Sequence, residues 1–327
     1  MRATLEERCQ RFIVNRDIIK IAFPMESAYI YPVCAAIFTQ KNITADGAKL
    51  KECHALLKEK TSVFSNFRGY ARLAMIAMMA TDQEPEKKLE RAMSVYDKLK
   101  EHFMGSQYLP LASMVISDSA AEEKYGEICS RTRKIYDLLK SEHPMLTSSE
   151  DVVFSAILAM SDLYEKQIVD DTERCYKILK ETFYSSNAVQ SLSHVLALFE
   201  GSARQKCREA TDLFDQLKEK GCRYGTQYEL ATLGVLAMQK RENENIIEDL
   251  LETDAYLATC KGYRGIFGFP KKTRLMHASM IVFGGLSDDQ TVMNTAAIGG
   301  TVAMVIAQQA AMCAAIAAAV AASSSNS

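Results

Sequence analysis

The sequence repeats itself about every forty residues, and this period restricts its possible folds more than any other feature. Four related phrases, YDKLKE, YDLLKS, YKILKE and FDQLKE, follow one another down the middle of the chain. Their aromatic residues are spaced 40, 40 and 38 residues apart and are Tyr96, Tyr136, Tyr176 and Phe214. Self-similarity with a period of this length is typical of proteins built from stacked helical units.

Each phrase predicts one face of an amphipathic helix, because a leucine follows three positions after the aromatic residue and residues three apart share a helix face. Long helices are predicted at roughly 84–102, 121–141, 168–181, 203–220 and 242–259. Between them lie nearly uncharged segments, which predict short helices buried on all sides. These segments are LAMIAMMA (73–80), DVVFSAILAM (151–160), SLSHVLALF (191–199) and ELATLGVLAM (229–238).

Together these patterns predict an all-α chain made of six or seven α-hairpins, beginning near residue 27 after an N-terminal helix at 3–21. The 15 Gly and 6 Pro among 327 residues are too few for a turn-rich β-fold. Because no hairpin can bury its own apolar face, the hairpins must stack in order. We expect a strongly curved array or a closed α/α toroid. The predicted helical-repeat domain covers residues 1–287.

Several phrases of the chain resemble a bacterial family that is catalogued only as a domain of unknown function. The phrases are ERCQRFIVNRDIIKIAF, YIYPVCAAIF, LKEKTSVFSNFRG, LTSSEDVVFSAILAMSD, NAVQSLSHVLAL and YELATLGVLA, together with the Ala-rich C-terminus. The resemblance runs over nearly the full length. It implies a bacterial cytoplasmic protein and supplies no catalytic residues.

Charge and cysteine usage narrow the possible partners and the compartment. The formal net charge is −2, so no global field favours nucleic acid. Nine cysteines occur without a CxxC pair, which indicates reduced thiols in the cytosol. The N-terminal stretch is charged throughout and lacks the apolar run of a signal peptide.

The polar loops that lead into the short helices are expected to lie at one end of the array and to form a ligand rim. Helix capping is the simpler role for each loop taken singly. The loop 260–277 departs most from the repeat, because it carries five basic residues and three glycines. Such a loop suits a phosphate or a carboxylate, although a solvated loop is an equal alternative. The predicted anion-binding residues are Arg68, Arg72, Arg264, Lys271, Lys272 and Arg274.

No catalytic signature accompanies this loop. His277 is the best candidate for moving protons, since it follows the basic loop, and Glu150 is a second candidate because it opens a buried helix with Asp151. Helix capping is the simpler role for that acidic pair. His194 fits a buried core position. The five histidines show no zinc-binding spacing, so we predict neither a metal nor a cofactor.

The C-terminal end differs from the repeats. Residues 295–322 contain no charge and 13 alanines, and we predict an Ala-rich helix at 288–322 followed by a disordered tail at 323–327. The stretch is long enough to span a membrane, but two glutamines at its centre and the lack of flanking basic residues speak against insertion. Docking on the array is preferred over self-association and over membrane insertion, and both alternatives stay open.

Two classes of function remain. The first is a binding or scaffold module that holds a protein partner or an anionic small molecule at the ligand rim. The alternative is an enzyme with an α/α-toroid pocket, in which the basic residues hold an anionic substrate and His277 or Glu150 moves protons.

Overall fold

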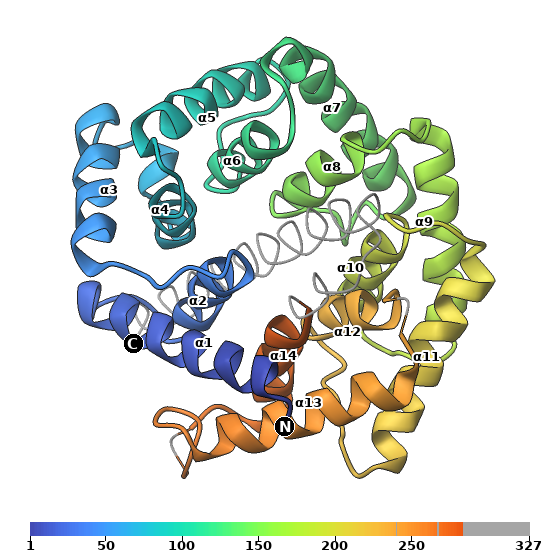
Figure 1. The fold of residues 1–327 in the computed structure, drawn as a ribbon. Helices are drawn as coiled ribbons and strands as arrows, with labels where there is room; N and C mark the ends of the chain where they lie inside the picture. The colour runs from blue at the N-terminus through green and yellow to red at the C-terminus, as the bar shows by residue number, and fades with distance from the viewer. Residues whose placement is uncertain (240, 267, 284–327) are drawn as a thin grey trace, which may run out of the picture. The chain divides into compact units, whose positions relative to one another are not determined.

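The computed structural model describes residues 1–239, 241–266 and 268–283, and every regular element among these residues is a helix. The prediction of an all-α chain is therefore confirmed for this part. Long and short helices alternate (Figure 1). The long α-helices have 14 to 20 residues and are α1 (Ala3–Ala22), α3 (Gly47–Lys60), α5 (Pro85–Lys100), α7 (Tyr125–Glu142), α9 (Glu165–Leu179), α11 (Ala203–Glu219) and α13 (Asn243–Thr259).

The short α-helices have 8 to 12 residues and are α2 (Ile30–Gln40), α4 (Arg72–Ala80), α6 (Leu109–Ser119), α8 (Asp151–Ala159), α10 (Ser186–Leu196), α12 (Leu230–Ala237) and α14 (Lys271–Val282). Two 3₁₀ turns, η1 (Asn66–Arg68) and η2 (Glu122–Lys124), precede α4 and α7. The helices form two compact units. One contains residues 14–165, and the other combines residues 1–13 with the described residues from 166 onward.

In the unit of residues 14–165 the helices lie in two layers (Figure 1). The long helices α3, α5 and α7 pack side by side in one layer, and α2, α4, α6 and α8 follow one another in the second. Each of α3, α5 and α7 also packs against the short helix that comes after it. The short helices are buried on nearly every side, as their uncharged sequences predict; in α8 every residue is buried.

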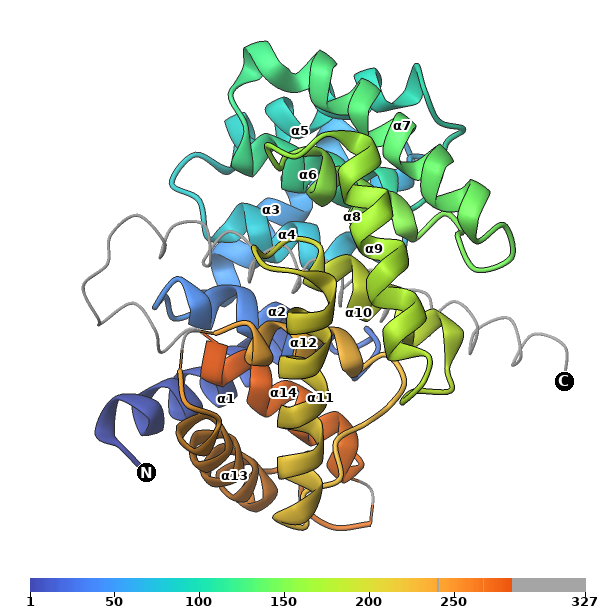
Figure 2. The ribbon, with the colours of Figure 1, turned by 90° about the vertical axis from the view of Figure 1, so that its right-hand side faces the viewer.

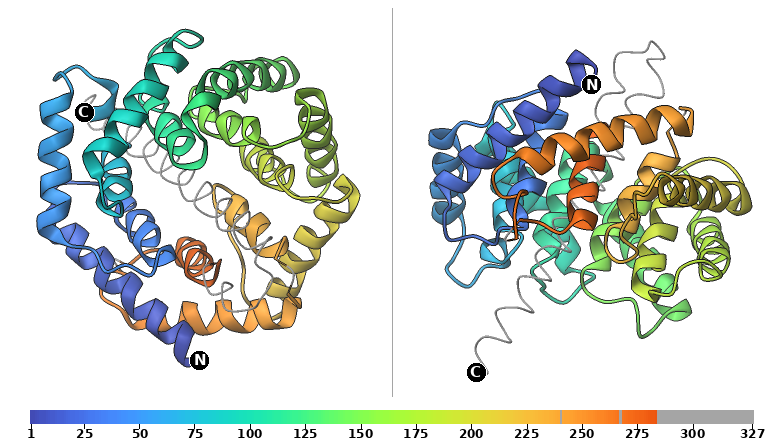
Figure 3. Two further views of the ribbon diagram at one scale, coloured as in Figure 1. Left: turned by 45° about the horizontal axis from the view of Figure 1, so that its top comes forward. Right: turned by 90° about the horizontal axis from the view of Figure 1, so that it is seen from below.

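In the second unit, α12 packs between α10 and α14, while α11 and α13 pack against each other (Figure 2). Residues 1–13 join helices from the far end of the chain and lie beside α13 (Figure 3). Arg8 donates two hydrogen bonds to the carbonyl of Ile281 in α14, at 3.1 and 2.7 Å. The α-amino group of Met1 forms an ion pair of 2.9 Å with Glu252 in α13.

Aromatic rings from the loops that lead into the short helices pack on rings of the next long helix, and three phrase residues, Tyr96, Tyr136 and Phe214, take part in such pairs. Phe103 packs edge-to-face on Tyr136, with ring centroids 5.4 Å apart, and Phe183 packs on Phe214 at 5.0 Å. The pairs Phe23 with His54 and Phe67 with Tyr96 have the same geometry. The leucine three positions after each ring is buried, as predicted. In these copies the phrase residue thus anchors the loop that leads into the preceding short helix.

Capping explains some of the helix starts but not all of them. The side chain of Asp46 accepts a hydrogen bond from Ala48 N at the start of α3, and Ser202 accepts one from Gln205 N at the start of α11. The segment predicted to start at 191 begins five residues earlier, at Ser186. The polar residues of SSNAVQ indicate a loop, but they form the first turn of α10, and Gln190 is buried within it.

The Phe183–Phe214 pair can be tested by a double-mutant cycle on unfolding free energy. We expect Phe183→Leu and Phe214→Leu to destabilise the protein, and the coupling between them to be about 0.5–1.5 kcal/mol, as for other edge-to-face pairs. Urea unfolding measures all four proteins of the cycle. Strictly additive effects would show that the rings fill space without interacting.

Candidate functional site

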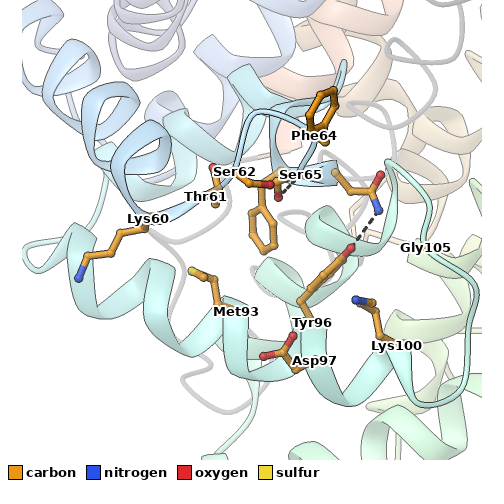
Figure 4. A pocket seen from close by; sticks show the side chains of 12 residues that line it. Lys60, Thr61, Ser62, Phe64, Ser65, Met93, Tyr96, Asp97, Lys100 and Gly105 are labelled. Carbon is orange, nitrogen blue, oxygen red and sulfur yellow. Dashed lines mark hydrogen bonds between the residues drawn. The ribbon is translucent and has the colours of Figure 1, made fainter.

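A partly open cavity lies in the unit of residues 14–165, between the segment 60–67 and α5, and it has a volume of about 420 Å³ (Figure 4). Two loops contribute to it, and each of them leads into a short helix. The first leads from α3 to α4, and the second leads from α5 to α6 and supplies Gly105. The cavity therefore belongs to the loops that lead into the short helices, where the sequence predicts a ligand rim.

The first loop is held in place by its own polar groups. The Arg68 guanidinium donates hydrogen bonds to the carbonyls of Lys58 and Thr61 and, at 3.2 Å, to the Thr61 hydroxyl. The Ser65 hydroxyl accepts a hydrogen bond from Phe67 N and caps η1. Arg68, which we predicted to bind an anion, thus fastens the loop that forms the cavity wall.

The apolar surface of the cavity comes from Phe67, Met93 and Tyr96. Phe67 is buried and packs edge-to-face on Tyr96, with ring centroids 5.1 Å apart. The neighbouring Asn66 of the same loop donates a hydrogen bond of 2.9 Å from its Nδ2 group to the Tyr96 hydroxyl, which fixes the ring further (Figure 4). Met93 lies three residues before Tyr96 and so shares its helix face.

Charged groups stand at the edges of the cavity. Lys60 pairs with Glu86 at 2.6 Å and with Glu90 at 3.2 Å. The ammonium of Lys100 lies 5.7 Å from the centre of the Tyr96 ring, and Asp97 lines the same region. The cavity therefore combines an apolar part, made by Phe67, Met93 and Tyr96, with polar and charged groups of both signs.

Large apolar side chains project into solvent beside the cavity and at matching places in other loops. Phe64 is 97% exposed, and the loops before α2, α6 and α8 expose Met25 (95%), Met104 (93%) and Met145 (95%). We call these four residues the apolar loop tips. They are 39, 40 and 41 residues apart (64−25, 104−64, 145−104), which is the period of the phrases. In the second unit, Tyr184 and Ile266 are exposed in the same kind of loop.

The predicted anion-binding residues are spread over both units. In the unit of residues 14–165, Arg72 forms an ion pair with Glu26. In the other unit, Arg274 is held by both oxygens of Asp254, at 2.7 and 3.2 Å. Convergence of the two groups on one ligand stays a prediction.

The remaining basic residues surround a compact loop. Lys271 reaches the Gly221 carbonyl at 3.4 Å, whereas Arg264 and Lys272 are exposed. The backbone of the loop is used for its own turns, because Gly268 N donates to Gly265 O and Phe269 N donates to Gly262 O.

One glycine in this loop is required by close contact. A Cβ atom at Gly268 would lie 2.3 Å from the Tyr263 carbonyl oxygen. The glycines therefore serve the turn, and the donors of Gly268 and Phe269 are already paired within it.

His277 lies in the core beneath the basic loop. It is fully buried, and its Nδ1 atom lies 3.0 Å from the Tyr263 hydroxyl. The Phe269 ring packs on it edge-to-face at 5.1 Å. This arrangement stabilises the loop, and the proposed role of His277 in moving protons stays a prediction. His194 is also fully buried, as expected of a core residue.

Glu150 and Asp151 stand at the start of α8. Glu150 occupies the N-cap position and accepts a hydrogen bond from the Ser148 hydroxyl, while Asp151 accepts one of 2.8 Å from Ser148 N. Burial raises the pKa of Asp151 to about 7. The pair thus tethers the loop before α8.

Further predictions from the sequence concern a cysteine, a metal site and a membrane span, all outside this cavity. Burial raises the pKa of the Cys53 thiol to about 11, so Cys53 is protonated at neutral pH. Among the described residues, no group of three or more His, Cys, Asp or Glu side chains could hold a metal ion. No helix in the described part of the chain is long and apolar enough to cross a membrane. The predicted helix at 288–322 and the tail at 323–327 lie outside the described residues.

Sequence reasoning missed the cavity, although it singled out residues on both of its walls. Tyr96 belongs to a repeated phrase and Phe67 to the phrase LKEKTSVFSNFRG, but nothing in their spacing indicates that they meet. A usable signal lay in the loops themselves. Phe103-Met104 and Phe183-Tyr184 are pairs of large apolar residues in otherwise polar loops, and in each pair the first side chain is sheltered and the second exposed.

The comparisons with known proteins place the chain without assigning it an activity. A family model described as a protein of unknown function (DUF4003) matches residues 17–310. No curated protein and no solved structure matches the chain.

The raised pKa of Asp151 predicts how stability changes with pH. Between about pH 4 and pH 7 the folded protein binds more protons at this carboxyl group than the unfolded chain does, so the unfolding free energy falls as the pH rises. We expect Asp151→Asn to raise the unfolding free energy by a few kcal/mol at pH 8, since each tenfold change in a proton-binding constant is worth about 1.4 kcal/mol.

Urea unfolding at pH 4.5 and pH 8 measures this effect. The advantage of Asn should shrink at the lower pH, and the exposed Asp162→Asn serves as the matched control. An equal gain at both pH values would rule out ionisation of Asp151 as its cause.

Proposed function

The chain belongs to this family of proteins of unknown function, and from the geometry of its site we propose that it is a binding or scaffold module for a protein partner. The loops that lead into the short helices form its ligand rim, and the cavity beside α5 accepts an apolar side chain of the partner. The observation that carries the proposal is a cavity built from two such loops, in which Phe67, Met93 and Tyr96 form an apolar part of the wall and the exposed Phe64 stands at the edge.

The chemistry of the cavity favours a protein partner over a small anion. Lys60 is already neutralised by two glutamates, and Arg68 is bonded to the backbone of the loop. Val63 and Phe64 are exposed side by side, and a partner would remove their apolar surface from water. Aromatic residues at the centre of an interface commonly carry most of its binding free energy.

The same proposal includes the fold that carries this rim. It is an array of α-hairpins of about forty residues each, and the array closes on itself. The alternation of long and short helices supports the hairpin repeat. The contacts of residues 1–13 with α13 and α14 support closure, because they join the first helix to the last described helices. Arg8 is buried in this contact.

A reducing compartment such as the cytosol suits the cysteines. All eight cysteines in the described part of the chain are free thiols, and seven of them are buried. Burial raises the pKa of Cys9 and of Cys129 to about 12, which keeps both thiols protonated and unreactive.

Closure of the array predicts compact dimensions in solution. A compact chain of 327 residues has a radius of gyration of about 20 Å. We expect small-angle X-ray scattering to give a value within a few ångströms of this one. A clearly larger radius and an elongated distance distribution would indicate an open solenoid instead.

The cavity can be tested with N-acetyl-tryptophanamide, which imitates an aromatic side chain of a partner. The protein is labelled with ¹³C at its methionine methyl groups, so that Met93 reports from the cavity wall. We expect a shift of the Met93 signal with a Kd on the order of 1 mM, equal to about −4 kcal/mol. Phosphate and citrate are titrated in parallel as small anions.

Two variants make this test specific. Ser62→Trp places an indole in the cavity and should abolish binding of the probe, whereas Ser94→Trp, at an exposed serine of α5 that does not line the cavity, should preserve it. If the Met93 signal does not shift when the aromatic probe is added, the proposal is overturned. A shift with phosphate or citrate alone would assign the cavity to a small anion.

A further inference from the structure

Three of the four apolar loop tips are methionines. Met25, Met104 and Met145 are each more than 90% exposed, although methionine is among the residues most often buried. The same protein holds methionines of the opposite kind, since Met75, Met114 and Met280 are fully buried. The exposed residues occupy equivalent loops, before α2, α6 and α8, in one compact unit.

This placement gives the three sulfur atoms a reactivity that the buried ones lack. Oxidation of a thioether depends on access of the oxidant to sulfur, and these side chains are open to solvent on nearly all sides. We propose that Met25, Met104 and Met145 are a reversible oxidation site for peroxides, at which conversion to the sulfoxide makes the ligand rim polar. The effect on partner binding rests on the proposed function; the site of oxidation does not.

The chemistry is a two-electron transfer of one oxygen atom. The methionine sulfur attacks one oxygen of hydrogen peroxide, the O–O bond breaks, and an S–O bond forms. The second oxygen leaves as hydroxide, which takes the proton from the transferred oxygen and becomes water, so each side chain becomes a sulfoxide with one added oxygen atom. Methionine sulfoxide reductases reverse the change, one enzyme acting on each sulfoxide epimer.

The fold should survive this modification, because the loops are anchored by other residues. Phe103, next to Met104, is held against Tyr136. Phe23, two residues before Met25, is held against His54. In the third loop, Thr147 N donates a hydrogen bond of 3.0 Å to His143 O across Met145. Oxidation thus changes the surface of the rim while its scaffold keeps its contacts.

Met104 lies closest in sequence to the cavity, because the next residue, Gly105, lines it. A Cβ atom at Gly105 would already lie 3.0 Å from Asn66 Nδ2, so the backbone is close to the cavity wall here. A sulfoxide on Met104 would place a strong hydrogen-bond acceptor beside an apolar binding surface. Such a group must be desolvated when a partner covers it, which weakens binding.

The test uses the full chain treated with dilute hydrogen peroxide and analysed by peptide mass spectrometry over time. We expect Met25, Met104 and Met145 to gain oxygen at least ten-fold faster than Met75, Met114 and Met280, because access limits the rate. Circular dichroism should show unchanged helix content. Treatment with both sulfoxide reductases should restore the original mass.

Variants separate the site from general oxidation. The triple variant Met25→Leu, Met104→Leu and Met145→Leu should lose the fast phase, whereas the buried Met114→Leu should keep it. Retention on a phenyl column should fall after oxidation of the native chain and stay unchanged for the triple variant. Similar rates at exposed and buried methionines, or unfolding before the three sites react, would overturn the inference.

The two proposals fail in different ways. If the aromatic probe does not bind but the three methionines react first, only the proposed function is lost. If the probe binds and the methionines react without selectivity, only the oxidation site is lost.

Discussion

The contact between a ring in one loop and a ring on the next long helix organises the rest of the structure. It fixes the loop against its neighbour, and in two loops the residue that follows the anchored ring lies in solvent. When Phe103 and Phe183 are held inside, Met104 and Tyr184 are directed into solvent. One packing interaction therefore stabilises the units and produces their exposed apolar surface.

Much of the fold could be predicted from the sequence because the apolar residues that become buried recur at a regular spacing. The leucines of the phrases and the uncharged short segments mark which faces are buried, and these positions need no knowledge of distant contacts. Helix starts were less predictable. Ser186, Asn187 and Gln190 favour a loop by composition, yet they form a helical turn because tertiary packing outweighs such local preferences.

The candidate site was less accessible to sequence reasoning because charge pairing acts over long separations. Arg72 is neutralised by Glu26, 46 residues earlier, and Arg274 by Asp254, 20 residues earlier. Counting basic residues in a loop takes no account of such partners. The cavity likewise depends on the path of the segment from Lys60 to Phe67, which is set by hydrogen bonds of Arg68 to the backbone.

The bond between Arg8 and Ile281 has a consequence for synthesis of the chain. Residues 14–165 are contiguous, so the contacts among them can form as soon as this stretch leaves the ribosome. The first residues of α1 make their contacts only after α13 and α14 have been synthesised, because these helices supply Glu252 and Ile281. At about 5–20 residues per second, this wait lasts roughly 12–60 s. During that interval the thiol of Cys9, which is buried in the folded protein 4.0 Å from the Thr253 hydroxyl, lacks this partner and adds apolar surface to the nascent chain.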